Sequence, residues 1–420
     1  MNNSKLKESN IKWLGKIPDN WKTIKFNALY DLRNEKVSDK DFPPLSVTKM
    51  GIVPQLSNAA KTNNGDNRKL VEIGDFAINS RSDRRGSCGI SKYEGSVSLI
   101  NTVLKPINRE MNPRYYGWLF KTVEFADEFY KWGHGIVDDL WTTNWQDMKN
   151  ITLVCPSKTE QNKIADFLDK KVLQIDDISK KIQQEITDLE KYRKSIITKA
   201  VTKGLSPNVP MKNSNISWIG EVPSNWHIEK LKFIAETRNN KELLSNVQNN
   251  YIGLENIVKN TGQYVCSNTT YEEGYYDVCK KGDILYGKLR PNLSKVLVAP
   301  FDSCCSGEFL IFKSAKINLK YLFYYLLSQG ITEIATSAIY GTKMPRVSWD
   351  FIKNLFISFP PKNEDQKEIV NYLDIQCNKI DSILKNKHIL LKKLNQYKQS
   401  IIYEYVTGKK QVPTEEGAVE

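Results

Sequence analysis

The amino-acid sequence predicts an α+β protein: two mixed α/β domains separated by two long antiparallel coiled-coil helices, arranged as a pseudo-two-fold internal repeat. Three observations support this fold class. Residues 157–203 and 362–408 align without a gap at an offset of 205 residues. Both segments carry apolar residues at heptad spacing, which is typical of helices paired along their length. The blocks before them consist of short apolar runs broken by Gly, Pro and Asn, which indicates strands and turns.

The repeat divides the chain into five parts. We expect a first domain at 1–156, a central spacer helix at 157–203, a second domain at 204–361, a C-terminal spacer helix at 362–408 and a polar tail at 409–420. The two long segments match closely. The two domains match only at residues that mark turns and element boundaries, as Gly74-Asp75 does with Gly282-Asp283. Similar scaffolds that carry dissimilar domains indicate that the two domains recognise different things.

The heptad pattern predicts which faces of the long helices are buried. One seam is expected at Leu168, Ile175, Ile182, Leu189 and Ile196, and in the second helix at Leu373, Ile380, Leu394 and Ile401. A second seam is expected beside the first, at Ile164, Ile178, Tyr192, Ile369, Ile383, Leu390 and Tyr397. Glu185 and Lys387 interrupt these seams, so additional contacts are expected there. Ser157-x-x-Glu160 and Asn363-x-x-Gln366 fit capping boxes. The helices could pair with each other or with other chains.

A second repeated phrase precedes each domain. It reads W-L-G-K-I-P-D-N-W at 13–21 and W-I-G-E-V-P-S-N-W at 218–226. We expect its tryptophans to pack a loop onto the following domain and to carry no chemistry. Residues 1–8 are polar and expected to be frayed.

Composition favours a polyanionic partner. The formal charge is +13, from 61 basic and 48 acidic residues, although a basic but ordinary soluble protein would show the same excess. The seven cysteines form no C-x-x-C pair and there are only three histidines, so a structural zinc site is not expected. Free thiols, a polar N-terminus and the lack of a long apolar run predict a soluble cytoplasmic protein without a membrane span.

Two basic loops at corresponding places are candidates for DNA contact, each following a Gly-Asp pair. The first loop supplies Arg81, Arg84 and Arg85, and the second supplies Lys288, Arg290, Asn292 and Lys295. A further loop at 341–346 adds Lys343 and Arg346. Its counterpart at 133–144 carries Asp138 and Asp139, which makes the equivalence of these two segments doubtful. Arg, Lys and Asn suit both phosphates and base edges, whereas the alternative for any one of them is a solvated surface.

No catalytic, cofactor-binding or metal site is predicted. Asn112-Pro113-Arg114-Tyr115 resembles the N-P-P-Y motif of DNA amino-methyltransferases, but a simple helix start explains it better, because the repeat partner reads Asn318-Leu319-Lys320-Tyr321. The chain has no G-x-x-x-x-G-K-[ST] loop for ATP. Two alternatives remain at this point: a self-contained DNA methyltransferase or nuclease with unrecognised motifs, and a coiled-coil assembly protein that does not bind DNA.

The motifs together resemble the specificity subunit of type I restriction–modification systems. The resemblance rests on the phrase at 13–21 and 218–226, on P-x-x-x-E-Q-x-x-I-x-x-x-L at 156–168, and on Y-R-x-S-I-I with T-x-G at 192–204. In the second copy, Asp365-Gln366 replaces Glu-Gln. The resemblance covers essentially the whole chain.

This resemblance implies a non-catalytic subunit with two target recognition domains that read a bipartite, asymmetric DNA sequence across a fixed gap. It implies double-stranded DNA, two methyltransferase (modification) subunits and two restriction motor–nuclease subunits as partners. S-adenosylmethionine, ATP and Mg are then expected on those partner subunits, and no cofactor on this chain.

Overall fold

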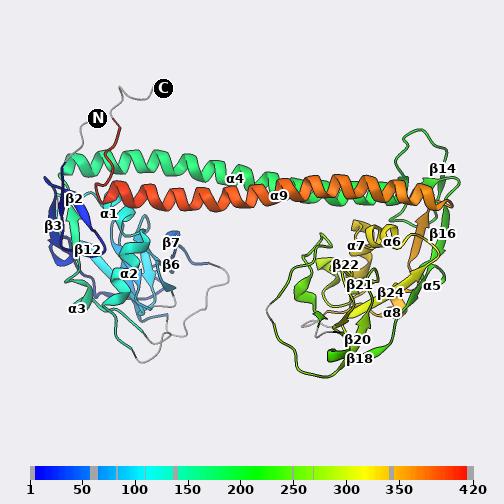
Figure 1. The fold of residues 1–420 in the computed structure, drawn as a ribbon. Helices are drawn as coiled ribbons and strands as arrows, with labels where there is room; N and C mark the ends of the chain where they lie inside the picture. Colours follow the sequence, from blue (N-terminus) through cyan, green and yellow to red (C-terminus); the bar gives the residue numbers. More distant parts are fainter. Residues whose placement is uncertain are drawn as a thin grey trace. The chain divides into compact units, whose positions relative to one another are not determined.

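The protein forms two compact units in the computed structural model, which describes residues 5–56, 65–81, 84–108, 110–135, 141–247, 250–267, 269–339 and 345–413. Unit 1 comprises Met1–Lys181 with Ile389–Glu420, and unit 2 comprises Ile182–His388. The long helices are α4 (Lys158–Lys203) and α9 (Asn363–Val406), so both unit boundaries fall inside a helix (Figure 1). Each unit therefore contains one head, called head 1 (residues 5–157) and head 2 (residues 204–362), with part of each long helix.

Head 1 is a mixed α/β domain whose main sheet is antiparallel, with strand order β10-β9-β12-β4. A second sheet, β11-β8-β5, and the hairpin β6-β7 lie beside it. The elements of head 1 are β1 (Leu6–Glu8), β2 (Lys16–Pro18), β3 (Lys22–Lys25), β4 (Tyr30–Leu32), β5 (Lys36–Val37), β6 (Leu45–Thr48), β7 (Gly51–Pro54), β8 (Arg68–Val71), β9 (Phe76–Asn79), β10 (Cys88–Ile90), β11 (Gly95–Val97), β12 (Asn101–Pro106), α1 (Pro113–Leu119), α2 (Val123–Lys131), α3 (Trp145–Met148) and β13 (Thr152–Cys155). Leu6–Glu8, which the sequence predicts to be frayed, form β1 and pair with β2.

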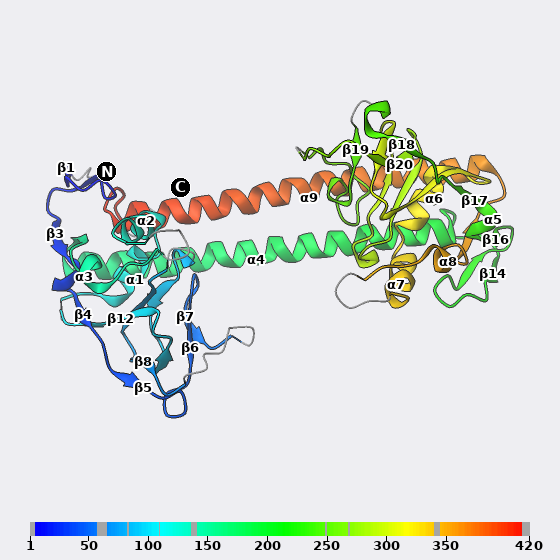
Figure 2. The same cartoon turned by 90° about the horizontal axis from the view of Figure 1, so that it is seen from below.

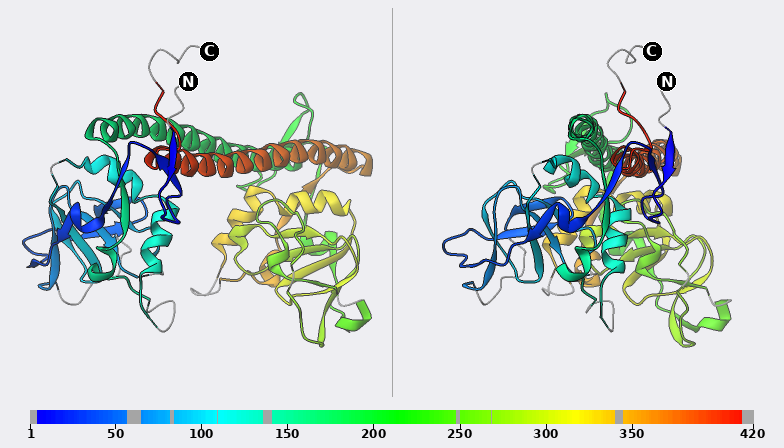
Figure 3. Two further views of the ribbon diagram at one scale, coloured as in Figure 1. Left: turned by 60° about the vertical axis from the view of Figure 1, so that its left-hand side comes forward. Right: turned by 90° about the vertical axis from the view of Figure 1, so that its left-hand side faces the viewer.

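Head 2 repeats this plan with sheets β17-β24-β21-β22 and β18-β20-β23-β19. Its elements are β14 (Met211–Asn213), β15 (Glu221–Pro223), β16 (His227–Lys230), α5 (Leu231–Ile234), β17 (Ala235–Thr237), β18 (Lys241–Leu243), β19 (Tyr251–Ile252), β20 (Tyr275–Cys279), β21 (Ile284–Gly287), β22 (Val296–Val298), β23 (Ser303–Cys305), β24 (Phe309–Ala315), α6 (Leu319–Leu326), α7 (Gln329–Ser337), α8 (Trp349–Ile352) and β25 (Phe356–Phe359). The helix α6 lies against α9 in two views (Figures 1 and 3). The predicted α+β internal repeat is thus confirmed.

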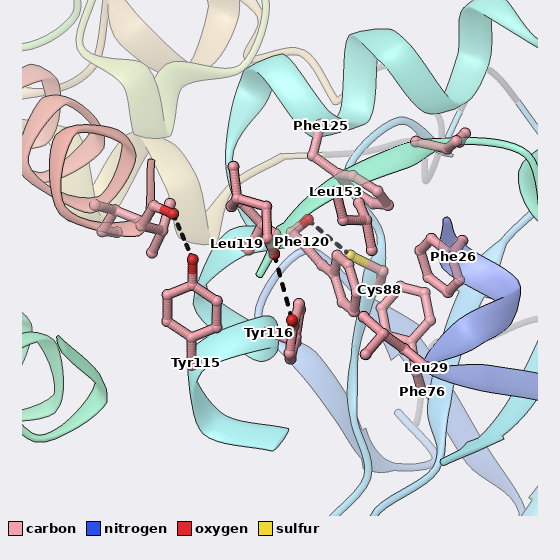
Figure 4. Close-up of a cluster of buried hydrophobic side chains, with 14 of the residues drawn as sticks. Phe26, Leu29, Phe76, Cys88, Tyr115, Tyr116, Leu119, Phe120, Phe125 and Leu153 are labelled. Carbon is pink, nitrogen blue, oxygen red and sulfur yellow. Dashed lines mark hydrogen bonds between the residues drawn. The ribbon is translucent and has the colours of Figure 1, made fainter. Parts of the chain in front are cut away.

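Aromatic side chains form the core of head 1 and join it to the long helices (Figure 4). The ring of Phe120 contacts those of Phe26 and Phe76, with centroid distances of 5.1 and 4.5 Å. The buried Tyr115 hydroxyl donates to the carbonyl of Val406 in α9 at 2.6 Å. In unit 2 the Tyr321 hydroxyl donates to Val201 O at 3.0 Å. Equivalent tyrosines therefore bind each head to a long helix. Burial raises the pKa of both phenols, which keeps them neutral donors.

The long helices pair antiparallel inside each unit. In unit 1, Phe167 packs on Tyr405 and Asp176 binds Lys398, so residue numbers rise in one helix as they fall in the other (Figure 2). In unit 2, Glu185 binds Lys387 and Arg193 binds Asp381 in the same sense. The two long helices therefore pair with each other within the chain. The two residues that interrupt the predicted seams, Glu185 and Lys387, are each other's partner.

Of the two predicted seams, one is buried along most of its length and the other only at Ile164 and Ile369, which are 5% and 4% exposed. Leu168, Ile175, Ile182 and Ile196 are at most 8% exposed, as are Leu373, Ile380 and Ile401. The second seam is wrong for most of its length, because Ile178, Tyr192, Ile383, Leu390 and Tyr397 are between 44% and 54% exposed. Two helices bury one narrow stripe, and the neighbouring positions are covered only where a head packs on them.

One predicted capping box is confirmed and the other is wrong. The backbone N–H of Ser157 donates to Glu160 Oε2, while the backbone N–H of Glu160 donates to Ser157 Oγ. The Gln366 side chain does not cap α9, because it binds head 2. Its Oε1 accepts from the N–H of Asn318 at 2.7 Å, and its Nε2 donates to Pro360 O at 2.8 Å.

The repeated tryptophan phrase connects the head to both long helices. In unit 1, Trp13 packs edge-on against Phe125 of α2, and Trp21 Nε1 donates to Glu160 at the start of α4. Tyr403 near the end of α9 donates to Trp13 O. The phrase therefore contacts the following domain, as predicted, and also forms hydrogen bonds with the start of α4 and the end of α9.

Candidate nucleic-acid interface

In head 1, the predicted basic loop lies beside the segment that precedes α3. Arg81 forms an isolated antiparallel bridge with Thr142, and the N–H of Thr143 donates to Ser80 O at 3.0 Å. Arg81 and Arg84 are exposed. Arg85 is also exposed; it pairs with Asp127 at 2.9 Å and lies 5.4 Å from the centroid of the Tyr130 ring.

Head 2 has the same junction between two loops. Leu289 forms an antiparallel bridge with Arg346, the N–H of Arg290 donates to Pro345 O at 2.8 Å, and Val347 N–H donates to Lys288 O at 3.1 Å. The second loop of each head thus occupies the same place beside the basic loop. The sequence leaves the equivalence of the two second loops doubtful, and these backbone contacts support it. Asp138, Asp139 and Lys343 lie outside the described residues.

The basic loop of head 2 is held in a strained, well-bonded conformation. Arg290 and Ser294 have left-handed backbone angles, with φ of 51° and 45°, on either side of a 3₁₀ turn at Pro291–Leu293. A left-handed non-glycine residue is unfavourable and persists only where its surroundings fix it. Here the Ser294 and Thr332 hydroxyls bond at 3.1 Å. Arg290 and Asn292 are exposed at the turn, and a guanidinium and a carboxamide are the groups that pair with guanine and adenine edges.

Other predicted site residues also make contacts inside head 2. Lys295 Nζ donates to Leu254 O at 2.6 Å, and burial lowers the pKa of this ammonium. Arg346 binds both carboxylate oxygens of Glu308 at 2.6–3.0 Å, which lowers the pKa of that carboxyl group. Lys288 is half-buried beside this pair. These contacts position the two loops, and a DNA contact by any of the nine residues stays a prediction.

Sequence reasoning missed a pair of buried ion pairs behind the loops. Arg33 binds Asp75 at 2.6 Å in head 1, and Arg238 binds Asp283 at 2.7 Å in head 2. The two aspartates belong to the repeated Gly-Asp pairs, and the two arginines are themselves 205 residues apart. The repeated Gly-Asp pairs, which are 208 residues apart, and the arginines at the 205-residue offset were the available signal. Within the part of the chain that the structure describes, no group of three His, Cys, Asp or Glu side chains is placed to hold a metal ion, and no helix is long and apolar enough to cross a membrane.

Comparisons with known proteins agree with this architecture. A family model described as the type I restriction modification DNA specificity domain matches residues 18–188 and again 223–408. The specificity subunit of the type I restriction enzyme EcoDI from Escherichia coli is 24% identical over 420 residues, which cover 94% of this chain and 89% of that one. The MjaVIII specificity subunit from Methanocaldococcus jannaschii is 26% identical over 337 residues, 75% of this chain and 74% of that one.

Two solved structures share the fold. One, from work on complex assembly and conformational transition of the type I R-M system, has a TM-score of 0.68 and 13% identity over 94% of this chain and all of that one. The HsdS subunit from Thermoanaerobacter tengcongensis has a TM-score of 0.51 and 14% identity, covering 94% of this chain and 98% of that one. With the family model matching both repeats, the chain belongs to the type I restriction–modification specificity subunits, whose function is DNA sequence recognition.

Proposed function

We propose that each head reads one half of a bipartite, asymmetric DNA sequence through the junction of its two loops. The observation that carries this proposal is the contrast between the repeats. The contacts that hold each head to its helices recur between equivalent residues, as Tyr115–Val406 and Tyr321–Val201 do. The loops at the junction differ in sequence, with Arg81 and Arg84 in one and Arg290 and Asn292 in the other. Equivalent head–helix contacts combined with different loop residues suit an asymmetric DNA target.

The excess of basic residues supplies the sequence-independent part of the affinity. Lysine and arginine side chains release counterions when they bind phosphates, so binding should weaken steeply as salt rises. Base-specific contacts add discrimination of about 1–3 kcal/mol for each good bidentate pair.

The long helices set the gap between the half-sites and carry two modification subunits. This chain performs no chemical step. S-adenosylmethionine binds the modification subunits, and ATP and Mg bind two restriction motor–nuclease subunits, all in the cytoplasm. The exposed apolar residues along the helices, including Ile178 and Ile383 at equivalent positions, support a protein-binding role for that surface.

The test is to express the chain with its cognate modification subunits in a host without adenine methylation and to map the methylated adenines. A two-part motif with a constant gap is expected. Arg81→Ala should relax one half of the motif and Arg290→Ala the other. Relaxation of both halves by either substitution, or methylation by this chain without modification subunits, would contradict the proposal.

The gap can be tested separately. Insertion of one heptad into both α4 and α9 preserves the buried stripe and lengthens each helix by about 10 Å, or about three base pairs. The permitted gap should increase. The matched control inserts seven Gly-Ser residues into the polar tail, where no change in the gap is expected.

A further inference from the structure

The helices α1 and α6 occupy the same place in their units, but one residue differs sharply in size. Trp118 Nε1 donates to Asp169 at 2.7 Å, and the Tyr324 hydroxyl donates to the equivalent Asp374 at 2.6 Å. The preceding residue is therefore Gly117 in unit 1 and Phe323 in unit 2. Unit 1 has a hydrogen atom where unit 2 has a phenyl ring.

Unit 2 fills this place with its own chain. The Phe323 ring packs on Gly262, where even a Cβ atom would lie 2.3 Å from the ring. Arg193 holds the same turn by donating to the carbonyl oxygens of Asn260 at 2.8 Å and Thr261 at 3.0 Å. Phe323 is 6% exposed as a result.

Unit 1 leaves the corresponding place open. The turn between β6 and β7 lies beside β10, where Gly51 closely approaches Gly89, just as Gly262 lies beside Val296 of β22. Between this turn and α1 is a cavity of about 570 Å³, lined by Met50, Ile73, Tyr93, Gly117, Trp118 and Lys121, among others. Met50 is 76% and Ile73 71% exposed, so large apolar side chains face solvent at its edge.

The charge at the cavity indicates what would complement it. Lys92, Arg114 and Lys121 line it with Asp169 as the sole acidic residue among its lining side chains. Arg114 is already paired with Asp166 and Asp169. Lys121 Nζ lies 5.2 Å from the centroid of the Trp118 ring, and burial lowers the pKa of this ammonium. A carboxylate beside Lys121 would reverse that shift.

We propose that this cavity binds a segment of one modification subunit that supplies a large apolar side chain, in the role that Phe323 has in unit 2, and an adjacent carboxylate for Lys121. The inference rests on the proposed function, which brings modification subunits to the long helices. The apolar surface continues along α4 to Leu173, which is one turn beyond Asp169 and 63% exposed. Because unit 2 fills its own site, the two modification subunits bind unequally.

The test titrates the full chain with the cognate modification subunit and resolves the one-to-one and two-to-one complexes by native mass spectrometry. Gly117→Phe places a ring in the cavity; an added Cβ would lie 3.4 Å from Ile90 and no closer to any other residue outside its own helix turn. We expect one of the two binding steps to weaken at least tenfold, with unchanged affinity of the chain alone for its DNA target. Gly117→Ala, which leaves the cavity open, should bind as the unsubstituted chain does.

A surface substitution controls for a folding defect in the Gly117→Phe variant. Ile73→Glu adds a repelling carboxylate on an exposed side chain and should weaken the same step, whereas Phe233→Glu, at a residue 57% exposed in head 2, should not. Unchanged binding by both Gly117→Phe and Ile73→Glu, or equal weakening of both steps, would overturn the inference and leave the proposed function intact. Failure of the unsubstituted chain to bind any modification subunit would overturn both.

Discussion

The side-chain oxygen of Gln161 accepts a hydrogen bond from the backbone N–H of Asn112 at 2.7 Å, which ties the first turn of α4 to the residue that caps α1. The same amide donates to Pro156 O at 2.9 Å. Gln161 is 1% exposed, so water cannot replace either bond. One glutamine side chain thus joins head 1 to the start of its long helix.

Replacing this glutamine should loosen head 1 alone. Gln161→Leu leaves a buried N–H and a buried carbonyl without partners, which costs about 1–3 kcal/mol for each group. Hydrogen exchange measured by mass spectrometry should accelerate in peptides from α1 and the start of α4. Gln366→Leu is the matched control and should accelerate exchange in head 2 instead. Equal exchange in both heads after either substitution would show that these amides do not act within separate units.

Equivalent ion pairs in the two units should differ in their effect on stability. Arg193 and Asp381 have side chains 5% and 13% exposed, whereas their counterparts Lys398 and Asp176 are 28% and 52% exposed. Removing one partner of a buried pair costs about 3–5 kcal/mol, and an exposed pair contributes about 0–1 kcal/mol. Arg193→Met should therefore lower the free energy of unfolding far more than Lys398→Met, as measured by denaturant titration. Similar losses would mean that the Asn260 turn does not depend on Arg193.

Two glycines that end the long helices should tolerate alanine unequally. Gly204 and Gly408 both have φ of +73°, a conformation that costs a residue with a Cβ atom about 1–2 kcal/mol. A Cβ at Gly408 would also lie 2.4 Å from Pro18, whereas at Gly204 the nearest atom is 3.2 Å away in Trp226. Gly408→Ala should lower the melting temperature more than Gly204→Ala does. The reverse order would indicate that the tryptophan phrase moves freely around the helix ends.

The Glu308–Arg346 pair should make the stability of head 2 sensitive to acid. Arg346 lowers the pKa of Glu308 below its usual 4.5 in the folded state. The pair therefore stabilises the fold above that value, and the stabilisation is lost as pH falls through the lowered folded pKa. The free energy of unfolding should fall less steeply between pH 4.5 and 3 in Glu308→Gln than in the unsubstituted protein. Parallel curves would remove this pair as a source of the pH dependence.

Arg290 should separate folding from recognition. Glycine adopts the left-handed conformation without strain. Arg290→Gly should therefore change the free energy of unfolding by no more than about 1 kcal/mol. The same substitution should relax the half-site read by head 2, as seen in the map of methylated adenines. Asn292→Ala serves as the companion variant at the same turn. Loss of stability together with unchanged recognition would assign Arg290 a structural role instead.

The sequence was most informative where local pattern and periodicity decide the structure. Asn112 caps α1, as the helix-start interpretation of Asn112-Pro113-Arg114-Tyr115 requires, and its side chain accepts from Arg114 N–H. The buried stripe through Leu168 and Ile175 follows directly from heptad spacing.

Long-range partners account for what the sequence did not reveal. Gln366 looks like a helix cap by spacing, but it bonds to Asn318, 48 residues earlier. Lys295 looks like a free cation, but it donates to Leu254 O, 41 residues earlier. Periodicity also cannot tell which apolar positions a head will cover, and this is why it predicts a buried seam at Ile178 and Tyr397 although both are exposed.

The boundaries of the two units have a consequence for how the chain can change over time. Unit 2 is one uninterrupted stretch, Ile182–His388, and it contains both members of the Arg193–Asp381 and Asn318–Gln366 pairs. Genetic exchange of the DNA encoding that stretch would transplant a complete unit with every one of those contacts, while the two chain ends would still close unit 1. Both junctions would fall in continuous α-helix, where the backbone hydrogen bonds form for any side chain other than proline. Under the proposed function, such an exchange would replace one half of the recognition sequence in a single event, without the need for a new internal interface.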